Sequence, residues 1–248
     1  MRSTEEIIHN QIQRYEVTKK VQKTAESKSG PDNLTEIDQA FQHPPICISR
    51  LLGSGARILA RMLQDRLNYI VFGKDIIDEV AKDLNVQRIL IDSLDETTRN
   101  NFELMLESSL RGREIDRQEY QFSLYRVIQA LGAQGGVVFL GRGANCILKE
   151  KSALNIFMSA DLDIRIKRVM EYDRLNEDEA KNKIHNFDRN RENFQNALMR
   201  NISGDNCDYD LQINTTRIKP EITIELVFKS LELRGYNPGK MKMPVIEK

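Results

Sequence analysis

Residues 46–60 read Ile46-Cys47-Ile48-Ser49-Arg50-Leu51-Leu52-Gly53-Ser54-Gly55-Ala56-Arg57-Ile58-Leu59-Ala60. The apolar run that begins at Ile46 is typical of a buried strand, and Ile58, Leu59 and Met62 recur at helical spacing after the glycines. The stretch therefore predicts a strand, a glycine turn and a helix. Glycines let backbone N–H groups converge, and the first turn of a helix carries the positive end of its dipole, so this turn is a candidate phosphate site.

The turn lacks two side chains of the usual nucleotide-binding loop. The motif G-x-x-x-x-G-K-[ST] has a lysine and a hydroxyl residue after its last glycine, and Ala56 and Arg57 stand in those places. A tight strand-to-helix turn without any ligand is therefore the alternative interpretation.

The composition excludes a strong global field. The chain has 248 residues, and its 37 basic and 37 acidic side chains cancel, so we expect neither a nucleic-acid partner nor a membrane partner. The apolar runs are too short to cross a bilayer, and the polar residues 1–6 do not resemble a secretory signal. We expect a cytoplasmic protein.

The cysteines and histidines predict no metal site. Cys47, Cys146 and Cys207 are widely spaced and form no C-x-x-C pair, so we expect reduced, mostly buried thiols.

Three regions follow from the pattern along the chain. Residues 1–44 form a polar helical extension with a linker, residues 45–235 an α/β domain, and residues 236–248 a loose tail. In the first region Ile8, Ile12 and Tyr15 make a narrow apolar stripe. Because a helix with so narrow a stripe is unstable alone, we expect it to pack on the domain or on a second copy of the chain, which would make a homo-oligomer.

Strand patterns alternate with helical patterns from residue 46 to residue 234. Strands are predicted from residue 46 up to the glycine turn and at 68–72, 137–140, 154–159 and 209–214, and this alternation favours a doubly wound parallel sheet of the α/β class. Four continuous apolar residues at 137–140 indicate a strand buried on both faces.

Arginines follow these strands at positions suited to an anion. Arg142 comes directly after strand 137–140, at the sheet edge where α/β proteins bind ligands, and a guanidinium can bind a phosphate through two hydrogen bonds. Asp188 and Arg191 lie three residues apart on one helix face, either as a surface ion pair or as part of a mobile cover over the site. In helix 162–170 we expect Arg165, Lys167 and Arg168 to form a solvated face.

Taken together, these residues resemble the cytidylate kinase-like branch of the P-loop nucleoside monophosphate kinases over about residues 45–235. The resemblance rests on the order of five segments, which are 48–57, 72–77, 141–145, 188–191 and 209–215. It implies a five-stranded parallel sheet, a small monophosphate-binding insertion after the second strand, and a helical lid. The implied reaction is transfer of the γ-phosphoryl group of ATP to CMP or dCMP, with Mg²⁺.

The resemblance also implies roles for particular residues. The ATP phosphates would lie on the backbone of Gly53, Ser54, Gly55 and Ala56. Arg142 would bind the monophosphate, Asp188 and Arg191 would act from the lid, and Asp75 is a looser match near the entrance of the monophosphate site. We expect the positive charge of the site to come from Arg50, Arg57, Arg142, Arg189 and Arg191, and the catalytic residues to be Arg57, Arg142, Asp188 and Arg191.

The chain departs from the family pattern where charge matters most. Ala56 replaces the lysine, Arg57 replaces a small or hydroxyl residue, and Leu140 replaces an acid before the glycine-arginine pair. Phosphoryl transfer depends mainly on positioning and on neutralising the charge of the γ-phosphate. Three hypotheses follow: a pyrimidine monophosphate kinase, a nucleotide-binding regulatory protein that has lost the reaction, and a kinase with another small acceptor.

Overall fold

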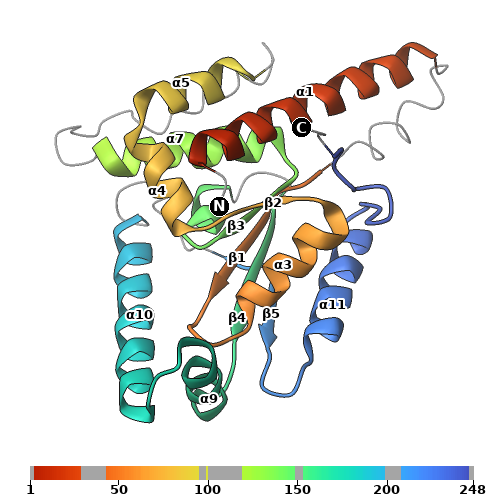
Figure 1. Cartoon of the computed structure of the whole chain (residues 1–248). Coiled ribbons are helices and arrows are strands. Elements are labelled where there is room, and N and C mark those ends of the chain that lie inside the picture. The colour runs from red at the N-terminus through yellow and green to blue at the C-terminus, as the bar shows by residue number, and fades with distance from the viewer. Residues whose placement is uncertain are drawn as a thin grey trace.

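The computed structural model describes residues 3–28, 43–94, 99, 119–148, 153–198 and 208–245. Five parallel strands form one sheet in the order β2-β3-β1-β4-β5 (Figure 1). The strands are β1 (Ile46–Arg50), β2 (Ile70–Phe72), β3 (Val137–Leu140), β4 (Leu154–Ser159) and β5 (Leu211–Asn214). The predicted doubly wound parallel sheet is confirmed.

Strand β3 is buried on both faces, as its continuous apolar run predicts. In β3, Val138 and Leu140 belong to one core cluster, whereas Val137 and Phe139 belong to the cluster on the opposite face. The sheet is therefore covered by helices on both sides.

The helices cover the two faces of the sheet, and two further helices lie beyond the carboxyl ends of its strands. The face of Val138 is covered by α3 (Ala56–Leu67) and α11 (Pro220–Leu233), and the face of Phe139 by α4 (Lys74–Lys82), α5 (Leu84–Asp92), α7 (Glu119–Gln134) and α8 (Ala144–Ile147). The pair α9 (Leu162–Asp173) and α10 (Glu177–Leu198) lies beyond the carboxyl ends of the strands (Figure 1). This pair has a small apolar core of its own and occupies the place of the implied helical lid.

The N-terminal helix α1 (Thr4–Lys28) packs on the domain. It begins with a capping box, in which the Glu6 N–H donates to Ser3 Oγ at 3.2 Å and the Ser3 N–H donates to Glu6 Oε2 at 3.1 Å. Ile8, Ile12 and Tyr15 are buried, and the helix contacts α4 and α5. The stripe is thus covered within the chain, and association of two copies through this helix stays a prediction that burial of the stripe no longer requires.

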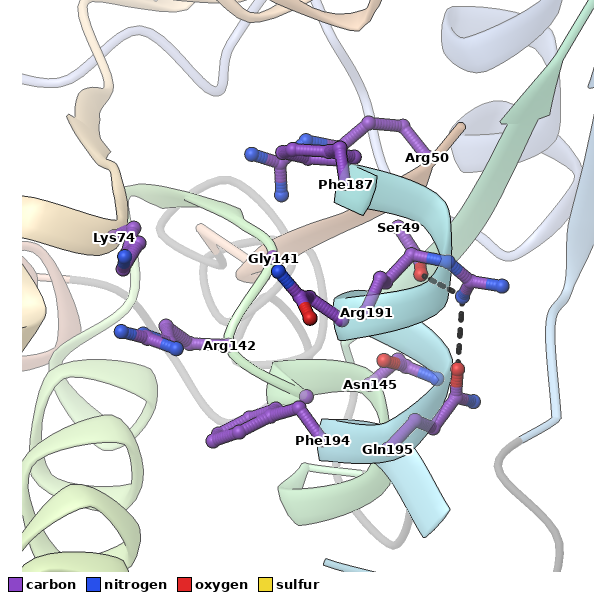
Figure 2. A pocket seen from close by; sticks show the side chains of 12 residues that line it. Ser49, Arg50, Lys74, Gly141, Arg142, Asn145, Phe187, Arg191, Phe194 and Gln195 are labelled. Carbon is purple, nitrogen blue, oxygen red and sulfur yellow. Dashed lines mark hydrogen bonds between the residues drawn. The ribbon is translucent and has the colours of Figure 1, made fainter. Parts of the chain in front are cut away.

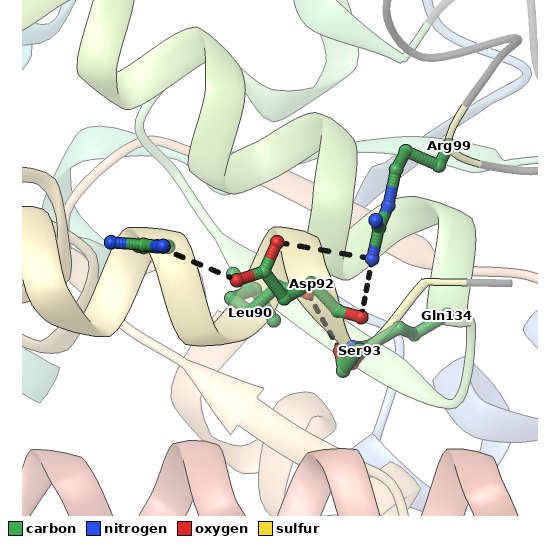
Figure 3. A network of polar contacts seen from close by, with 6 residues as sticks. Leu90, Asp92, Ser93, Arg99 and Gln134 are labelled. Atoms are coloured by element: carbon green, nitrogen blue, oxygen red, sulfur yellow. Dashed lines mark hydrogen bonds and ion pairs between the residues drawn. The ribbon is translucent and has the colours of Figure 1, made fainter. Parts of the chain in front are cut away.

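Polar contacts join the carboxyl-terminal ends of α5 and α7 (Figure 3). Gln134 Nε2 donates to Ser93 Oγ at 2.9 Å, and the Ser93 hydroxyl donates to the Leu90 carbonyl at 2.6 Å. Arg99 Nη2 donates to the Asp92 carbonyl at 2.6 Å. These bonds satisfy carbonyl groups that the last turn of α5 leaves without helical partners.

The segment after α11 is packed, so the predicted loose tail is wrong for residues 236–245. Met241 and Met243 are buried in the core that α3 and α11 cover, and the Met243 N–H donates to the Leu67 carbonyl at 2.9 Å. The predicted linker lies beyond residue 28 and outside the described residues.

The cysteines differ from the prediction at one position. Cys146 is disulfide-bonded, so the expectation of three reduced thiols is wrong. Cys47 is a free, buried thiol, and burial raises its pKa. Within the described ranges, none of the helices has the length and apolar character needed to cross a membrane.

Candidate active site

The glycine turn between β1 and α3 has the backbone shape that its sequence predicts. Gly53 and Gly55 adopt left-handed conformations with φ of 82° and 83°, and Gly55 caps the amino-terminal end of α3. Among the described residues, no acceptor faces the N–H groups of Gly53, Gly55, Ala56 or Arg57. Free donors at a helix amino terminus suit the oxygens of a polyphosphate.

A cavity of about 190 Å³ lies at the carboxyl ends of β1 and β3, and Arg50, the last residue of the strand that leads into the turn, lines it (Figure 2). Four of its lining residues are cationic, none is acidic, and several are amides or aromatic rings. The cations are Arg50, Lys74, Arg142 and Arg191. A cavity with this lining favours a small anion.

The pKa of Arg50 reflects the positive charges that gather at the cavity. Burial lowers the pKa of Arg50 to about 10, and the positive charges of Arg57, Arg191 and Arg142 add to this shift. Its guanidinium lies 5.3 Å from the Phe187 ring centroid, and a side chain at Gly141 would collide with its Nη1. A bound anion would relieve the repulsion among these arginines.

Replacing Arg50 with methionine should stabilise the protein without ligand and weaken anion binding. Because folding lowers the pKa of Arg50, its charge costs stability at every pH below about 10, and this penalty declines as the pH rises above about 10 toward the ordinary pKa of arginine. We expect about 1 kcal/mol of added stability near pH 7, or roughly 2–4 °C in Tm. Thermal unfolding with and without phosphate measures both effects. Phosphate should raise the Tm of the wild type more than that of the variant, and equal responses would contradict an anion site at Arg50.

Arg142 is fixed by an acidic partner outside the cavity. Its Nε donates to Asp78 Oδ1 at 2.6 Å, and its Nη2 forms a second bond to Asp78 Oδ2. Within the described residues Nη1 has no partner, so this group remains available to a ligand. Tyr120 also donates to Asp78, at 2.6 Å, and burial together with this hydrogen bond raises the pKa of Tyr120 to about 12. Arg142 itself has a φ of 56°, which is costly for a residue other than glycine and is often found at functional sites.

Arg191 reaches the cavity from α10 (Figure 2). It donates to Ser49 Oγ at 3.3 Å and to Gln195 Oε1 at 2.8 Å, and its guanidinium lies 5.3 Å from the Phe157 ring centroid. Arg191 thus contacts the end of β1 from the helix of the implied lid.

Asp188 pairs with the turn and with α9, so the first of the two alternatives, a surface ion pair with Arg191, is wrong. Its Oδ1 accepts from the Leu52 N–H at 3.0 Å, and its Oδ2 accepts from Arg165 Nη1 at 2.6 Å. Arg165 is buried and Arg168 is half-buried, so the predicted solvated face is also wrong for these two residues. Only Lys167 of the three is exposed.

The other candidate residues lie at the margin of the cavity or outside it. Arg57 is exposed and lies 5.3 Å from the Tyr172 ring centroid, although its charge is felt at Arg50. Arg189 is exposed and has a long contact of 3.5 Å with Asn186. Asp75 is exposed and does not line the cavity. Their assigned roles stay predictions.

Sequence reasoning missed the residues that support the site. Lys74 lines the cavity and Asp78 holds Arg142, yet both occur in the amphipathic pattern of α4. Their spacing of four residues places them on one helix face, which was the available signal.

The residues present fit ATP phosphates better than they fit a protein-bound Mg²⁺. The free N–H groups of the turn can donate hydrogen bonds to phosphate oxygens, as described above. Mg²⁺ in such sites is held by one or two carboxylates and by phosphates. Among the described residues no acidic or histidine cluster could hold a metal ion, and the carboxylate at the turn, Asp188, is already paired with Leu52 and Arg165.

Comparison with known proteins agrees with this geometry. A model of the cytidylate kinase-like family matches residues 45–217. A cytidylate kinase from Sulfolobus acidocaldarius is 28% identical over 185 residues, which cover 73% of this chain and 91% of that protein. An uncharacterized protein from Eubacterium ventriosum of known crystal structure shares the fold with a TM-score of 0.52 and 24% identity, over 76% of this chain and 98% of its own.

Proposed function

Because the chain belongs to the cytidylate kinase-like family, we propose that it is a nucleoside monophosphate kinase that transfers the γ-phosphoryl group of ATP to CMP or dCMP. Membership of this family and the similarity to a cytidylate kinase support a nucleotide kinase. The choice of ATP as donor and of a cytosine nucleotide as acceptor is our inference.

The observation that carries the proposal is the cluster of arginines around Arg50. Three guanidinium groups from β1, the turn after β3, and α10 line one cavity, and β1 leads directly into the turn with free backbone N–H groups. Their mutual repulsion is strong enough to lower the pKa of Arg50 beyond the effect of its burial. Two adjacent anion sites, one made of amides and one of arginines, match the needs of a reaction between two phosphate groups.

The proposed mechanism relies on position and charge. The turn would hold the donor phosphates through its backbone N–H groups, and Arg50, Arg142 and Arg191 would hold the acceptor phosphate. An oxygen of the acceptor phosphate attacks the γ-phosphorus, the bond to the β-phosphate oxygen breaks, and ADP leaves. Positively charged groups beside the γ-phosphate would stabilise the charge that spreads over its oxygens. The described residues supply no ligand set for Mg²⁺, so we assign no step to this ion.

A regulatory protein that binds nucleotide without turnover is the second candidate. Two observations favour it: Ala56 leaves the turn without a lysine, and Asp188 places a carboxylate on the Leu52 N–H. A kinase with another small phosphate or hydroxyl acceptor is the third candidate, because arginines and amides can bind many anions.

A phosphoryl-transfer assay separates the three candidates. Purified protein is incubated with ATP, Mg²⁺ and one acceptor from a panel of CMP, dCMP, UMP, AMP and small hydroxyl compounds, and the products are separated by chromatography. We expect CDP or dCDP. Calorimetric binding of nucleotide without product would support the regulator, and product from another acceptor would support the third candidate. Arg61→Ala, an exposed position on α3, is the control that should leave the result unchanged.

A further inference from the structure

The carbonyl side of the glycine turn is held by side chains from distant segments. Three consecutive carbonyls accept hydrogen bonds, namely Leu52 from Arg165 Nη1 at 3.3 Å, Gly53 from Arg168 Nη1 at 3.2 Å, and Ser54 from the Thr215 hydroxyl at 2.8 Å. Arg165 and Arg168 belong to α9, and Thr215 follows β5.

These bonds determine where the N–H groups of the turn point. In a trans peptide the carbonyl and the next N–H are on opposite sides of the chain, and the described residues contain no cis peptide bond. Carbonyls 52 and 54 are drawn toward α9 and the end of β5, so the N–H groups of Gly53 and Gly55 face the other way. The Ser54 N–H donates to the Leu51 carbonyl at 3.3 Å and is not one of these free donors. A row of N–H groups on one side of a turn forms an anion-binding concavity.

The donors are themselves fixed by further contacts. Arg168 also donates to Thr215, from Nη1 to Oγ1 at 2.9 Å and from Nη2 to the carbonyl at 2.9 Å. Arg165 donates to Asp188, which in turn accepts the Leu52 N–H. The turn thus lies in a network that depends on α9 and α10.

These contacts bear on the absence of a lysine at Ala56. In the usual loop a lysine binds the phosphates directly. Here the guanidinium groups of Arg165 and Arg168 donate to carbonyls on the opposite side of the same turn. They fix the orientation of its peptide groups and place two positive charges next to the turn. We propose that Arg165, Arg168 and Thr215 are positioning residues that orient the turn for a polyphosphate donor in the absence of that lysine. The identity of the polyphosphate as the donor nucleotide rests on the proposed function.

Thr215→Val is the most conservative test, because valine keeps the shape and removes the hydroxyl that holds Ser54. Binding of ADP, inorganic tripolyphosphate and CMP to the full chain is measured by calorimetry. We expect ADP and tripolyphosphate each to bind about five- to tenfold more weakly, as for the loss of one hydrogen bond, and CMP to bind unchanged. Thr215→Ser should restore the wild-type values.

The comparison of ADP with tripolyphosphate, which has no nucleoside, tests whether these side chains contact the nucleoside directly. A second cavity of about 230 Å³ touches Ser54, Arg168 and Thr215, so these side chains could contact a nucleoside instead of orienting the turn. A direct contact predicts weaker binding of ADP alone, and this result would overturn the proposal. Equal losses for ADP and tripolyphosphate support it.

Two controls separate positioning from general stability. Lys167→Met changes an exposed residue on the same helix and should alter neither ligand's affinity. Arg168→Met should weaken the binding of ADP more than Thr215→Val does, because Arg168 contacts both Gly53 and Thr215. A loss of CMP affinity equal to the loss of ADP affinity in either Arg168→Met or Thr215→Val would indicate a merely structural role and would overturn the proposal.

The outcomes also separate this proposal from the proposed function. Wild-type protein that binds tripolyphosphate and loses this binding in Thr215→Val, but forms no CDP, contradicts the kinase and supports the positioning role. Wild-type protein that forms CDP while Thr215→Val keeps its affinity for ADP supports the kinase and contradicts the positioning role. Wild-type protein that binds no polyphosphate contradicts the positioning role.

Discussion

Replacing Arg142 with alanine is expected to lower kcat/KM for CMP by about 100- to 1,000-fold. The side chain is 16% exposed and lines the cavity, and its Nη1 has no partner among the described residues. Its loss would remove a charge-assisted hydrogen bond to the acceptor phosphate and would leave Asp78 without its ion-pair partner, although the Tyr120 hydroxyl would still donate to it. Steady-state kinetics of CMP phosphorylation measures the effect, and Arg61→Ala is the matched control.

The partner of Arg142 permits a second test of the same idea. Asp78→Asn keeps the shape of the side chain and removes the charge that orients the guanidinium. We expect a smaller loss than for Arg142→Ala, since Arg142 and its positive charge remain. A kcat/KM for Arg142→Ala within threefold of the wild type would contradict any role of this arginine in the reaction.

Gly53→Ala is expected to lower the free energy of unfolding by about 2–4 kcal/mol. Its φ of 82° is costly for any residue with a Cβ, and an added Cβ would lie 2.8 Å from the carbonyl oxygen of Arg165. Because that neighbour is backbone, α9 must move away from the turn. Urea unfolding gives the free energy, and calorimetry should show weaker binding of ADP at the proposed donor site.

Gly235→Ala is the matched control for Gly53→Ala. Gly235 has a similar φ of 87°, but an added Cβ would meet no atom within 4 Å. It should therefore lose only the backbone term, about 1 kcal/mol. Equal losses of unfolding free energy in the two variants would show that close packing of α9 on the turn does not contribute to stability.

The sheet could be predicted because its signal is local. Continuous apolar residues at Val137–Leu140 and glycine turns after the strands follow from burial on both faces, and the structure shows both. Patterns of this kind need no knowledge of distant contacts.

The supporting arginines could not be predicted for the opposite reason. Apolar periodicity identified the inward face of α9, and by exclusion it placed Arg165 and Arg168 in solvent. Their partners are carbonyls of a turn more than a hundred residues earlier, which have no sequence signature. The segment after α11 shows the same limit, because its prolines and glycine suggested a loose tail while Met241 and Met243 entered the core.

The N-terminal helix lies outside residues 45–217, which match the family, yet Ile8 and Ile12 share one apolar cluster with Phe72, Phe139 and Leu124. A protein shortened to the family segment would expose the row of side chains on α4 and α5 that α1 now covers, and such a row invites aggregation. Expression plasmids for this kinase family member should therefore retain the first helix. Calorimetric melting of the intact chain should give one cooperative peak in which the helix and the α/β domain unfold together.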